Sequence, residues 1–185
     1  MEIYFTSDTH FYHSNIITYC NRAYSNVEEM NEDMIQNWNK VVRPNSHVYH
    51  LGDFAFTNKK NVKKVGEIID RLNGKIHLCI GSHDEKTIKL LGHKFYKIAE
   101  SFYLKSHDIF MSHYMHYVWP QSHYNSQHLF GHSHGRLNSE AEVHGKCMDV
   151  GVENHYYTPW SLSEIKDQMK IRPNNFNLVQ DYKHV

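Results

Sequence analysis

Five short motifs carry histidine side chains, carboxylate side chains or both, and each follows a run of apolar residues. In chain order they are Asp8-Thr9-His10, Gly52-Asp53, Gly81-Ser82-His83-Asp84, His113 and Gly131-His132-Ser133-His134. Residues two positions apart on extended backbone point to the same side, so Asp8 with His10, and His132 with His134, are suited to bind one ion or two neighbouring ions. Imidazole and carboxylate ligands without cysteine favour Mn, Fe, Zn or a similar divalent metal over calcium.

Asp53 is the residue around which the other motifs are expected to gather. The run His47–Leu51 predicts a buried strand, and Gly52 allows a sharp turn that places Asp53 at the end of that strand. A carboxylate held there can offer its two oxygens to two cations. A Gly-Asp pair alone is an ordinary turn, and a single DxH or HxH pair is more often structural. Five such motifs in this order are much more specific for a metal centre.

The composition indicates a globular chain with an excess of histidine. With 185 residues, 40% of them hydrophobic, the sequence predicts one domain over residues 1–185 with a substantial core. Its 20 lysine and arginine residues balance 20 aspartate and glutamate residues, so stable binding of duplex nucleic acid is not expected. The 17 histidines raise the expectation of a metal site, because imidazole is the commonest metal ligand.

Cysteine usage and the N-terminal residues predict a cytoplasmic protein without a membrane segment. Cys20, Cys79 and Cys147 lie far apart and show no CxxC spacing, which fits a reducing compartment. Residues 1–5 lack the basic and apolar regions of a signal peptide. No apolar run approaches the length that spans a bilayer.

The hydrophobic pattern of the first half predicts strand, helix, strand, helix, strand. We expect strands at 3–7, 47–51 and 75–80, a helix with capping-box spacing at Ser25–Glu28, and a helix over 61–72. Alternation of this kind implies parallel strands joined by helical crossovers. The chain is therefore expected to form a mixed α/β domain.

Shorter elements are predicted in the second half. A short helix over 85–91 precedes strands at 95–99, 102–105 and 109–112, whose tight connections suggest antiparallel pairing. Two further strands are expected at 128–130 and 146–150. Ser161-Leu162-Ser163-Glu164 predicts the capped start of a last helix ending near residue 170, and the tail from Pro173 is expected to be a strand or a loose end.

The motifs resemble those of the calcineurin-like metallophosphoesterases. That family shows DxH, then GD, GNH(D/E), H and GHxH, and the five motifs of this chain follow the same order. The local text is also similar to a small bacterial and phage branch of the family, in Ser7-Asp8-Thr9-His10-Phe11, Cys20-Asn21-Arg22, His50-Leu51-Gly52-Asp53-Phe54, and Asp149-Val150-Gly151-Val152-Glu153 followed by Thr158-Pro159. The resemblance therefore covers nearly the whole chain.

The resemblance implies a four-layer αββα sandwich, in which two mixed β-sheets are flanked by helices and the metals lie at strand ends. It implies two divalent metal ions. Mn is the ion expected first, with Fe, Zn or Ni as alternatives. By position, one ion would be held by Asp8, His10, Asp53 and His134, and the other by Asp53, Ser82, His113 and His132. Asp53 would then bridge the two ions.

The resemblance also implies a mechanism in which a hydroxide bridging the metals attacks phosphorus in line. His83 would protonate the leaving oxygen, and Asp84 would orient the His83 ring. Ser82 departs from the family, which has asparagine at this position. Because a serine hydroxyl is shorter than an asparagine amide and binds metal more weakly, we hypothesise that the second metal site is weakened and the activity reduced.

Three further features leave alternatives open. Arg22 could bind a substrate phosphate as a bidentate donor, or form a surface salt bridge. His13 could point into the same cleft as His10, although a supporting or helix-start role is favoured. The aromatic residues of Tyr114–Pro120 could stack on a base or cover the metals, or could pack in the core or at a dimer contact.

The sequence therefore predicts a binuclear, metal-dependent phosphohydrolase acting on a small phosphodiester or nucleotide-like phosphate ester. Phosphodiesterase activity is favoured over phosphomonoesterase activity. The alternatives are a phosphoprotein phosphatase and a catalytically impaired interaction scaffold of the same fold. Such scaffolds lose the acid or key ligands, whereas His83 and six of the seven ligand positions persist here.

Overall fold

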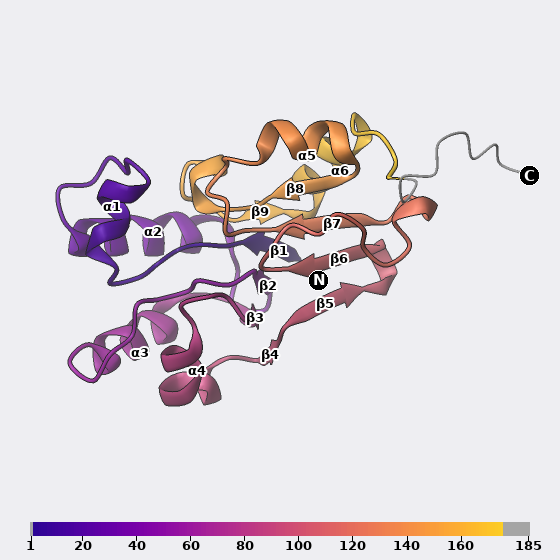
Figure 1. Ribbon diagram of the computed structural model, residues 1–185. Helices are drawn as coiled ribbons and strands as arrows, with labels where there is room; N and C mark the ends of the chain where they lie inside the picture. Colours follow the sequence, from indigo (N-terminus) through magenta and orange to yellow (C-terminus); the bar gives the residue numbers. More distant parts are fainter. Residues whose placement is uncertain (1, 176–185) are drawn as a thin grey trace, which may run out of the picture.

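Two mixed β-sheets form the centre of the computed structural model, which describes residues 2–175 (Figure 1). The first sheet has the order β4-β3-β2-β1-β9, with β1 to β4 parallel and β9 antiparallel, and the second has the order β5-β6-β7-β8. The strands are β1 (Ile3–Thr6), β2 (His47–His50), β3 (Lys75–Cys79), β4 (Lys97–Ala99), β5 (Ser101–Leu104), β6 (Ile109–Ser112), β7 (Gln127–Phe130), β8 (Cys147–Asp149) and β9 (Trp160–Ser161).

Helices cover the outer faces of both sheets. They are α1 (Ser14–Tyr19), α2 (Val27–Val41), α3 (Val62–Arg71), α4 (Glu85–Leu91), α5 (Asn138–His144) and α6 (Leu162–Lys170). In Figure 1, α1 to α4 gather at one end of the view, beside the first sheet, and α5 lies above the second sheet, whereas α6 contacts β9 and β1 of the first sheet. Among the described helices, none is long and apolar enough to cross a bilayer.

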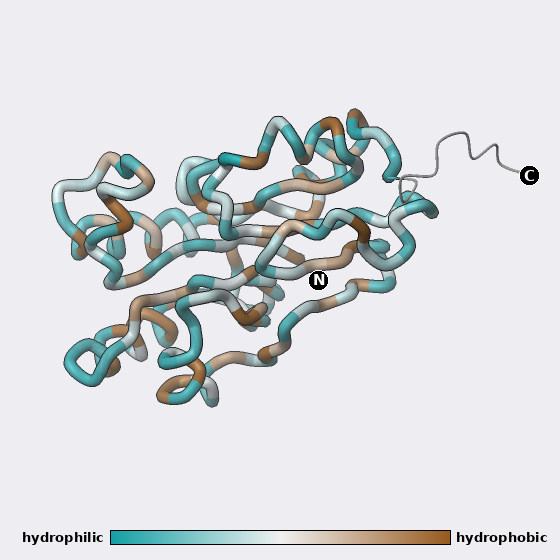
Figure 2. Tube along the Cα trace, in the orientation of Figure 1, coloured by the Kyte–Doolittle hydropathy of each residue, from teal (hydrophilic) through white to brown (hydrophobic). Residues whose placement is uncertain are grey.

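Three apolar cores separate the four layers. The first packs α2 and α3, through Met34 and Ile69, against Val48 and Leu78 of the first sheet. The second lies between the two sheets and the third lies between the second sheet and α5. Because strand side chains alternate between the faces, β1 places Phe5 in the second core while Tyr4 faces the first. Figure 2 shows the hydrophobic residues along these inner segments. The predicted αββα arrangement is confirmed.

The pairing of β4 corrects the sequence prediction. Residues 95–99 and 102–105 were expected to pair antiparallel, but β4 pairs in parallel with β3 through the crossover helix α4. The chain then passes at Glu100 into the second sheet, where β5 pairs antiparallel with β6. Two strand-like runs with a short connection have the same sequence pattern whether the second strand pairs with the first or enters the other sheet.

Helix ends also show what the sequence could and could not specify. The helix α2 begins one residue later than predicted, since Asn26 rather than Ser25 caps it and accepts a hydrogen bond from the Glu29 amide. The predicted capping box at Ser161 and Glu164 is confirmed. The short helices α1 and α5 were not predicted, because each buries a single residue and so lacks a periodic apolar pattern.

The tail from Pro173 was expected to be a strand or loose end. Residues 173–175 adopt no regular element, and the remainder of that prediction lies outside the described residues.

Hydrogen bonds beyond the strand ends hold the loops that follow β1 and β2 together. The amides of Asp8 and His10 donate to the carbonyl oxygens of Gly52 and Asp53, both at 3.0 Å. The Gly131 amide donates to the His113 carbonyl at 2.9 Å, which joins the loops after β6 and β7 in the same way. These contacts bring the motifs at the ends of four strands to one edge of the molecule.

His128 is a neutral histidine in the third core. Its Nε2 accepts a hydrogen bond from the His116 amide at 3.0 Å, and its ring packs near Trp119 and Phe130. Burial, with a smaller effect of the charge of His116, lowers the pKa of His128 to about 3. The folded protein therefore holds this ring neutral at pH values where an unfolded chain protonates it.

We predict that His128 makes the free energy of unfolding fall as the pH drops from about 6.5 to about 3, because only the unfolded state binds the proton in that window. Its contribution is up to about 1.4 kcal/mol per pH unit. Urea unfolding over this pH series should show a shallower dependence for His128→Gln than for the wild type. The exposed-site variant His93→Gln should keep the wild-type slope, and an unchanged slope for His128→Gln would contradict the assignment.

Candidate metal centre

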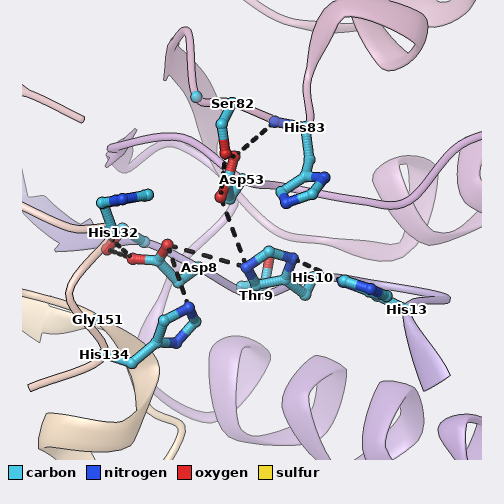
Figure 3. Close-up of polar contacts among 12 residues, drawn as sticks. Asp8, Thr9, His10, His13, Asp53, Ser82, His83, His132, His134 and Gly151 are labelled. Carbon is cyan, nitrogen blue, oxygen red and sulfur yellow. Dashed lines mark hydrogen bonds and ion pairs between the residues drawn. The ribbon is translucent and has the colours of Figure 1, made fainter. Parts of the chain in front are cut away.

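All seven residues predicted as metal ligands follow strand ends at this loop edge, and Figure 3 labels six of them, all except His113. Six of the seven form two groups whose ligand atoms lie within 4.8 Å of one another. We call Asp8, His10 and His134 the first trio, and Asp53, His113 and His132 the second trio. The two trios contain six of the seven residues in the ligand sets that the family resemblance implied, while Ser82 belongs to neither and Asp53 is grouped with the second alone.

Asp53 joins the two trios. Its Oδ2 lies 3.6 Å from Nε2 of His10 in the first trio and 3.5 Å from Nε2 of His113 in the second. Within the first trio, Oδ1 of Asp8 lies 3.9 Å from His10 Nε2 and 4.0 Å from His134 Nε2. Carboxylate oxygen thus faces imidazole nitrogen on both sides of Asp53.

Several of these facing atoms are buried and have no hydrogen-bond partner within residues 2–175. They are Asp8 Oδ1, His10 Nε2 and His113 Nε2. Since buried polar atoms are nearly always satisfied, three unpartnered ligand atoms within the two trios fit the binding of divalent cations. The donor set of imidazole and carboxylate is also the one that Mn, Fe and Zn accept.

Other hydrogen bonds fix the orientation of the ligand rings. His113 donates from Nδ1 to the Leu51 carbonyl at 2.8 Å, and His134 donates from Nδ1 to Glu153 Oε1 at 2.9 Å. Each bond leaves Nε2 as the free ligand atom and directs it toward the centre. Glu153 belongs to the segment 149–153 that resembles the family, but no role was predicted for it. Only the folded structure shows its contact with His134, because the two residues lie 19 positions apart in the sequence.

The electrostatic field around Asp53 favours opposite charges. Burial acts to lower the pKa of His113, but the nearby charges of Asp53 and Asp8 raise it to about 9. Burial would raise the pKa of Asp53, yet the charge of His113 and the hydrogen bond from the His83 amide hold it below its usual range. Burial raises the pKa of Asp8 to about 7. The ionised Asp53 carboxylate therefore stabilises positive charge in this centre.

The backbone at the ligand positions adopts an unusual conformation. Five of the seven have a φ in the left-handed region, namely Asp8 at 58°, His10 at 50°, Asp53 at 56°, His132 at 65° and His134 at 49°. This conformation costs about 1–2 kcal/mol for a residue other than glycine. Residues held in this way gather at functional sites, where the surrounding structure fixes them.

Glycine is required where the loops touch. A Cβ on Gly81 would collide with the backbone nitrogen of Asp53, and a Cβ on Gly131 would collide with Ser7 Oγ and, at 2.5 Å, with Asp8 Oδ2. The glycines of these motifs therefore permit close contact between loops, which brings Asp8 and Asp53 to their places.

Ser82 points its hydroxyl at the shared carboxylate. Its Oγ donates to Asp53 Oδ1 at 3.2 Å and to Oδ2 at 3.0 Å, and it belongs to neither trio. The backbone amide of the next residue, His83, also donates to Asp53 Oδ1 at 2.8 Å. In the described structure Ser82 thus supports Asp53, and its exposed side chain is shorter than the amide that the family has there.

Asp84 is bound differently from the prediction. It is fully buried, and its carboxylate accepts hydrogen bonds from the amides of Asp53 at 2.8 Å, Phe54 at 2.9 Å and Gly81 at 2.9 Å. Among the described residues, these backbone amides and not the His83 ring are its hydrogen-bond partners. Asp84 therefore ties the loop after β3 to the loop after β2, which places His83 and Asp53 indirectly.

Arg22 corrects the sequence prediction of a phosphate-binding residue. It is only 4% exposed, and its guanidinium donates to Glu153 Oε1 at 2.6 and 2.9 Å and to the carbonyl oxygens of Asp8 and Thr9 at 2.7 and 3.0 Å. The Arg22 guanidinium therefore forms its hydrogen bonds with groups of the protein. Arg22 holds the loop after β1 and the Glu153 carboxylate that orients His134.

Two hollows border the metal centre. One, which we call the acid hollow, has a volume of about 330 Å³ and is lined by His10 and His134 of the first trio, Asp53 and His132 of the second trio, and Ser82, His83, His13, Tyr19, Cys20 and Arg136. The other, the Tyr114 hollow, has a volume of about 430 Å³ and is lined by Ile80, Gly81, Glu100, Ser101, Phe110, Ser112, His113, Tyr114 and His116. Both volumes are large enough for a small ligand.

Arg136 and the aromatic segment show where residues outside the motifs lie. The exposed Arg136 lines the acid hollow and donates to the Tyr19 carbonyl at 3.2 Å; no role was predicted for it, although it lies only two residues after His134 of the last motif. His13 lies in the acid hollow too, 3.2 Å from His10 between their Nδ1 atoms. In the segment 114–120, Trp119 packs in the third core, whereas Tyr114 lies against the centre.

The chain belongs to the calcineurin-like phosphoesterase family, since residues 1–152 match the superfamily domain of that name. Over 171 residues, 89% of either chain, it is 39% identical to the uncharacterized protein MJ1445 of Methanocaldococcus jannaschii. The crystal structure of AQ665, a protein of unknown function from Aquifex aeolicus, has 26% identity and a TM-score of 0.69, covering 90% of this chain and 98% of that one. The nuclease MPE of Pseudomonas putida has 19% identity and a TM-score of 0.46, covering 70% of this chain and 60% of that one.

Family membership confirms the resemblance drawn from the motifs. The chain is thus a member of a metal-dependent phosphoesterase family, and the two trios are its candidate metal-binding groups.

We predict that Arg22→Met destabilises the protein by about 3 kcal/mol, because it leaves the mostly buried Glu153 carboxylate without its ion-pair partner. Urea unfolding measures this change. The matched variant Arg136→Met, at an exposed arginine, should shift the free energy of unfolding by no more than about 0.5 kcal/mol. Equal stability of the two variants would show that Arg22 has no structural role.

Proposed function

We propose that this protein is a binuclear, metal-dependent phosphohydrolase that cleaves a small phosphodiester or nucleotide-like phosphate ester. The observation that carries the proposal is the pair of trios joined through Asp53, whose carboxylate faces Nε2 of His10 and Nε2 of His113, both without a hydrogen-bond partner in the described structure. Mn is the ion that we expect to support activity best, with Fe, Zn and Ni as alternatives.

The residues of the chain would hold two cations on either side of Asp53. Asp8, His10, Asp53 and His134 would bind one, and Asp53, His113 and His132 would bind the other, with Ser82 beside it. When bound, a pair of divalent cations makes water nucleophilic near neutral pH and neutralises charge on the phosphoryl group. The protein would supply the fixed geometry, through ring hydrogen bonds and the left-handed loop backbone.

His83 is our proposed general acid. Its backbone is anchored to Asp53, and its exposed side chain lies in the acid hollow with its ring edge-on to His10 at 5.4 Å between centroids. A proton from this ring would go to the leaving oxygen as the bond to phosphorus breaks. Asp84 would act as a positioning residue, because it anchors the loop that carries His83.

Phosphodiesters are favoured over monoesters because hollows border the centre in two directions. A monoester has one organic group, which the acid hollow alone would hold, whereas a diester has two. Among the described residues that line the acid hollow, Arg136 is the one lysine or arginine and would bind a charged group of the substrate. This role replaces the one predicted for Arg22.

The direct test is Mn-dependent hydrolysis of bis(p-nitrophenyl) phosphate and of p-nitrophenyl phosphate, alongside the metal content of the protein. We expect faster turnover of the diester, and loss of turnover after removal of the metal by a chelator. Absence of turnover of either ester, with little metal bound, would instead support an interaction scaffold that keeps the motifs as structure.

We predict that His83→Ala lowers kcat by about 10²–10⁴-fold while Mn binding, measured by isothermal titration calorimetry, stays as in the wild type. The loss should be larger for diphenyl phosphate than for bis(p-nitrophenyl) phosphate, because phenoxide is the stronger base and needs the proton more. His93→Ala is the matched control and should retain full activity. A loss that is equal for both leaving groups would argue against general acid catalysis by His83.

We predict that Ser82→Asn strengthens the weaker of two Mn binding steps several-fold and raises diester turnover, since the longer amide reaches the second trio. Calorimetric titration with Mn gives both steps separately. Ser106→Asn, an exposed serine outside the centre, is the control and should change neither step. Two equal, tight binding steps in the wild type would contradict the idea that Ser82 weakens the second site.

A further inference from the structure

The Tyr114 hollow joins the metal centre from a different direction than the acid hollow. Its wall includes His113, a member of the second trio, and Gly81, which directly precedes Ser82. The acid hollow is lined instead by His83, by His10 and His134 of the first trio, and by Asp53 and His132 of the second trio. A phosphoryl group held between the trios would therefore have one hollow beside the proposed acid and a second hollow beside His113.

One side of this hollow presents flat, apolar surface. The Tyr114 ring is 49% exposed and lies edge-on to both His113 and His132, with centroids 4.7 Å apart in each case. Phe110 is buried in the wall, and Ile80 is 39% exposed. An aromatic ring fixed against two histidines is a suitable stacking surface for a planar group, because it needs little reordering on binding.

The charge of the hollow indicates what kind of group it suits. Among the described residues that line it there is no lysine or arginine, and its one carboxylate, Glu100, has no ion pair or hydrogen bond in the described structure. An anion such as a second phosphate is therefore disfavoured here. A neutral planar group that carries N–H donors would satisfy Glu100.

The proposed chemistry decides which part of a diester reaches this hollow. The leaving oxygen must lie near His83 to receive its proton, so the leaving group occupies the acid hollow. The other ester arm, which stays on the phosphate, has to leave the centre by another route. The Tyr114 hollow borders the second trio and offers that route.

We infer that the Tyr114 hollow binds the retained nucleoside arm of a phosphodiester, with the base stacked on Tyr114 and its N–H groups donating to Glu100. This inference rests on the proposed function and specifies its substrate class. It also assigns a role to one aromatic residue of the segment 114–120 that the sequence left between base stacking and core packing.

The test compares two diesters that share the p-nitrophenolate leaving group. We would measure kcat/KM for guanosine 5′-(p-nitrophenyl phosphate) and for methyl p-nitrophenyl phosphate with Mn. The wild type should prefer the guanosine ester, and Tyr114→Ala should lower the ratio of the two kcat/KM values by about tenfold. Glu100→Gln should lower the ratio several-fold, mainly through KM, whereas Tyr114→Phe should keep it. Because a ratio is measured, a general effect of Tyr114 on the neighbouring histidines cancels.

The controls separate this inference from the proposed function. Tyr124→Ala removes a tyrosine that is 70% exposed and outside both hollows, and it should leave the ratio unchanged. A wild-type ratio near one, or a ratio that Tyr114→Ala does not change, would overturn the inference while turnover of the methyl ester still supports the proposed function. No turnover of either diester by the wild type would overturn both.

Discussion

The carboxylate of Asp53 has to be held between two sets of ligands, and much of the structure serves that requirement. Its Oδ2 faces His10 on one side and His113 on the other, and its Oδ1 accepts hydrogen bonds from Ser82 and the His83 amide. A single flexible link in this arrangement would separate the trios. The parallel strands β1, β2 and β3 prevent this, because their carboxyl ends meet at one edge and their loops are bonded to one another.

The features of this loop edge that suit metal binding also lower the free energy of unfolding. Left-handed backbone at five ligand positions and unpartnered ligand atoms in the interior both cost free energy in the metal-free protein. The buried ion pair of Arg22 with Glu153, and the three amide bonds accepted by Asp84, offset part of that cost by fixing the loops. Arg22 and Asp84, which the sequence suggested as substrate-binding and catalytic residues, thus support the loops that carry the candidate metal ligands.

The mixed α/β class and the placing of the candidate ligands after strands could be predicted from local order along the chain, whereas the four-layer arrangement was implied by the family resemblance. Strand-like runs followed by DxH, GD and GHxH place ligands at strand ends wherever the strands lie. Burial could not be predicted in the same way. The sequence suggested that Arg22 donates hydrogen bonds to a substrate phosphate, whereas in the structure Arg22 is paired with Glu153, which is distant in sequence. The layer change at Glu100 and the position of Arg136 likewise depend on contacts between segments far apart in the chain.

Crystals of the protein grown with Mn, with anomalous diffraction measured from the bound ions, test the central claim most directly. We predict two anomalous peaks about 3.5–4 Å apart, one beside each trio, with the Asp53 carboxylate between them. A weaker peak beside His113 and His132 would agree with the role proposed for Ser82. One peak that Asp53 does not touch, or two peaks bound by other residues, would contradict the account.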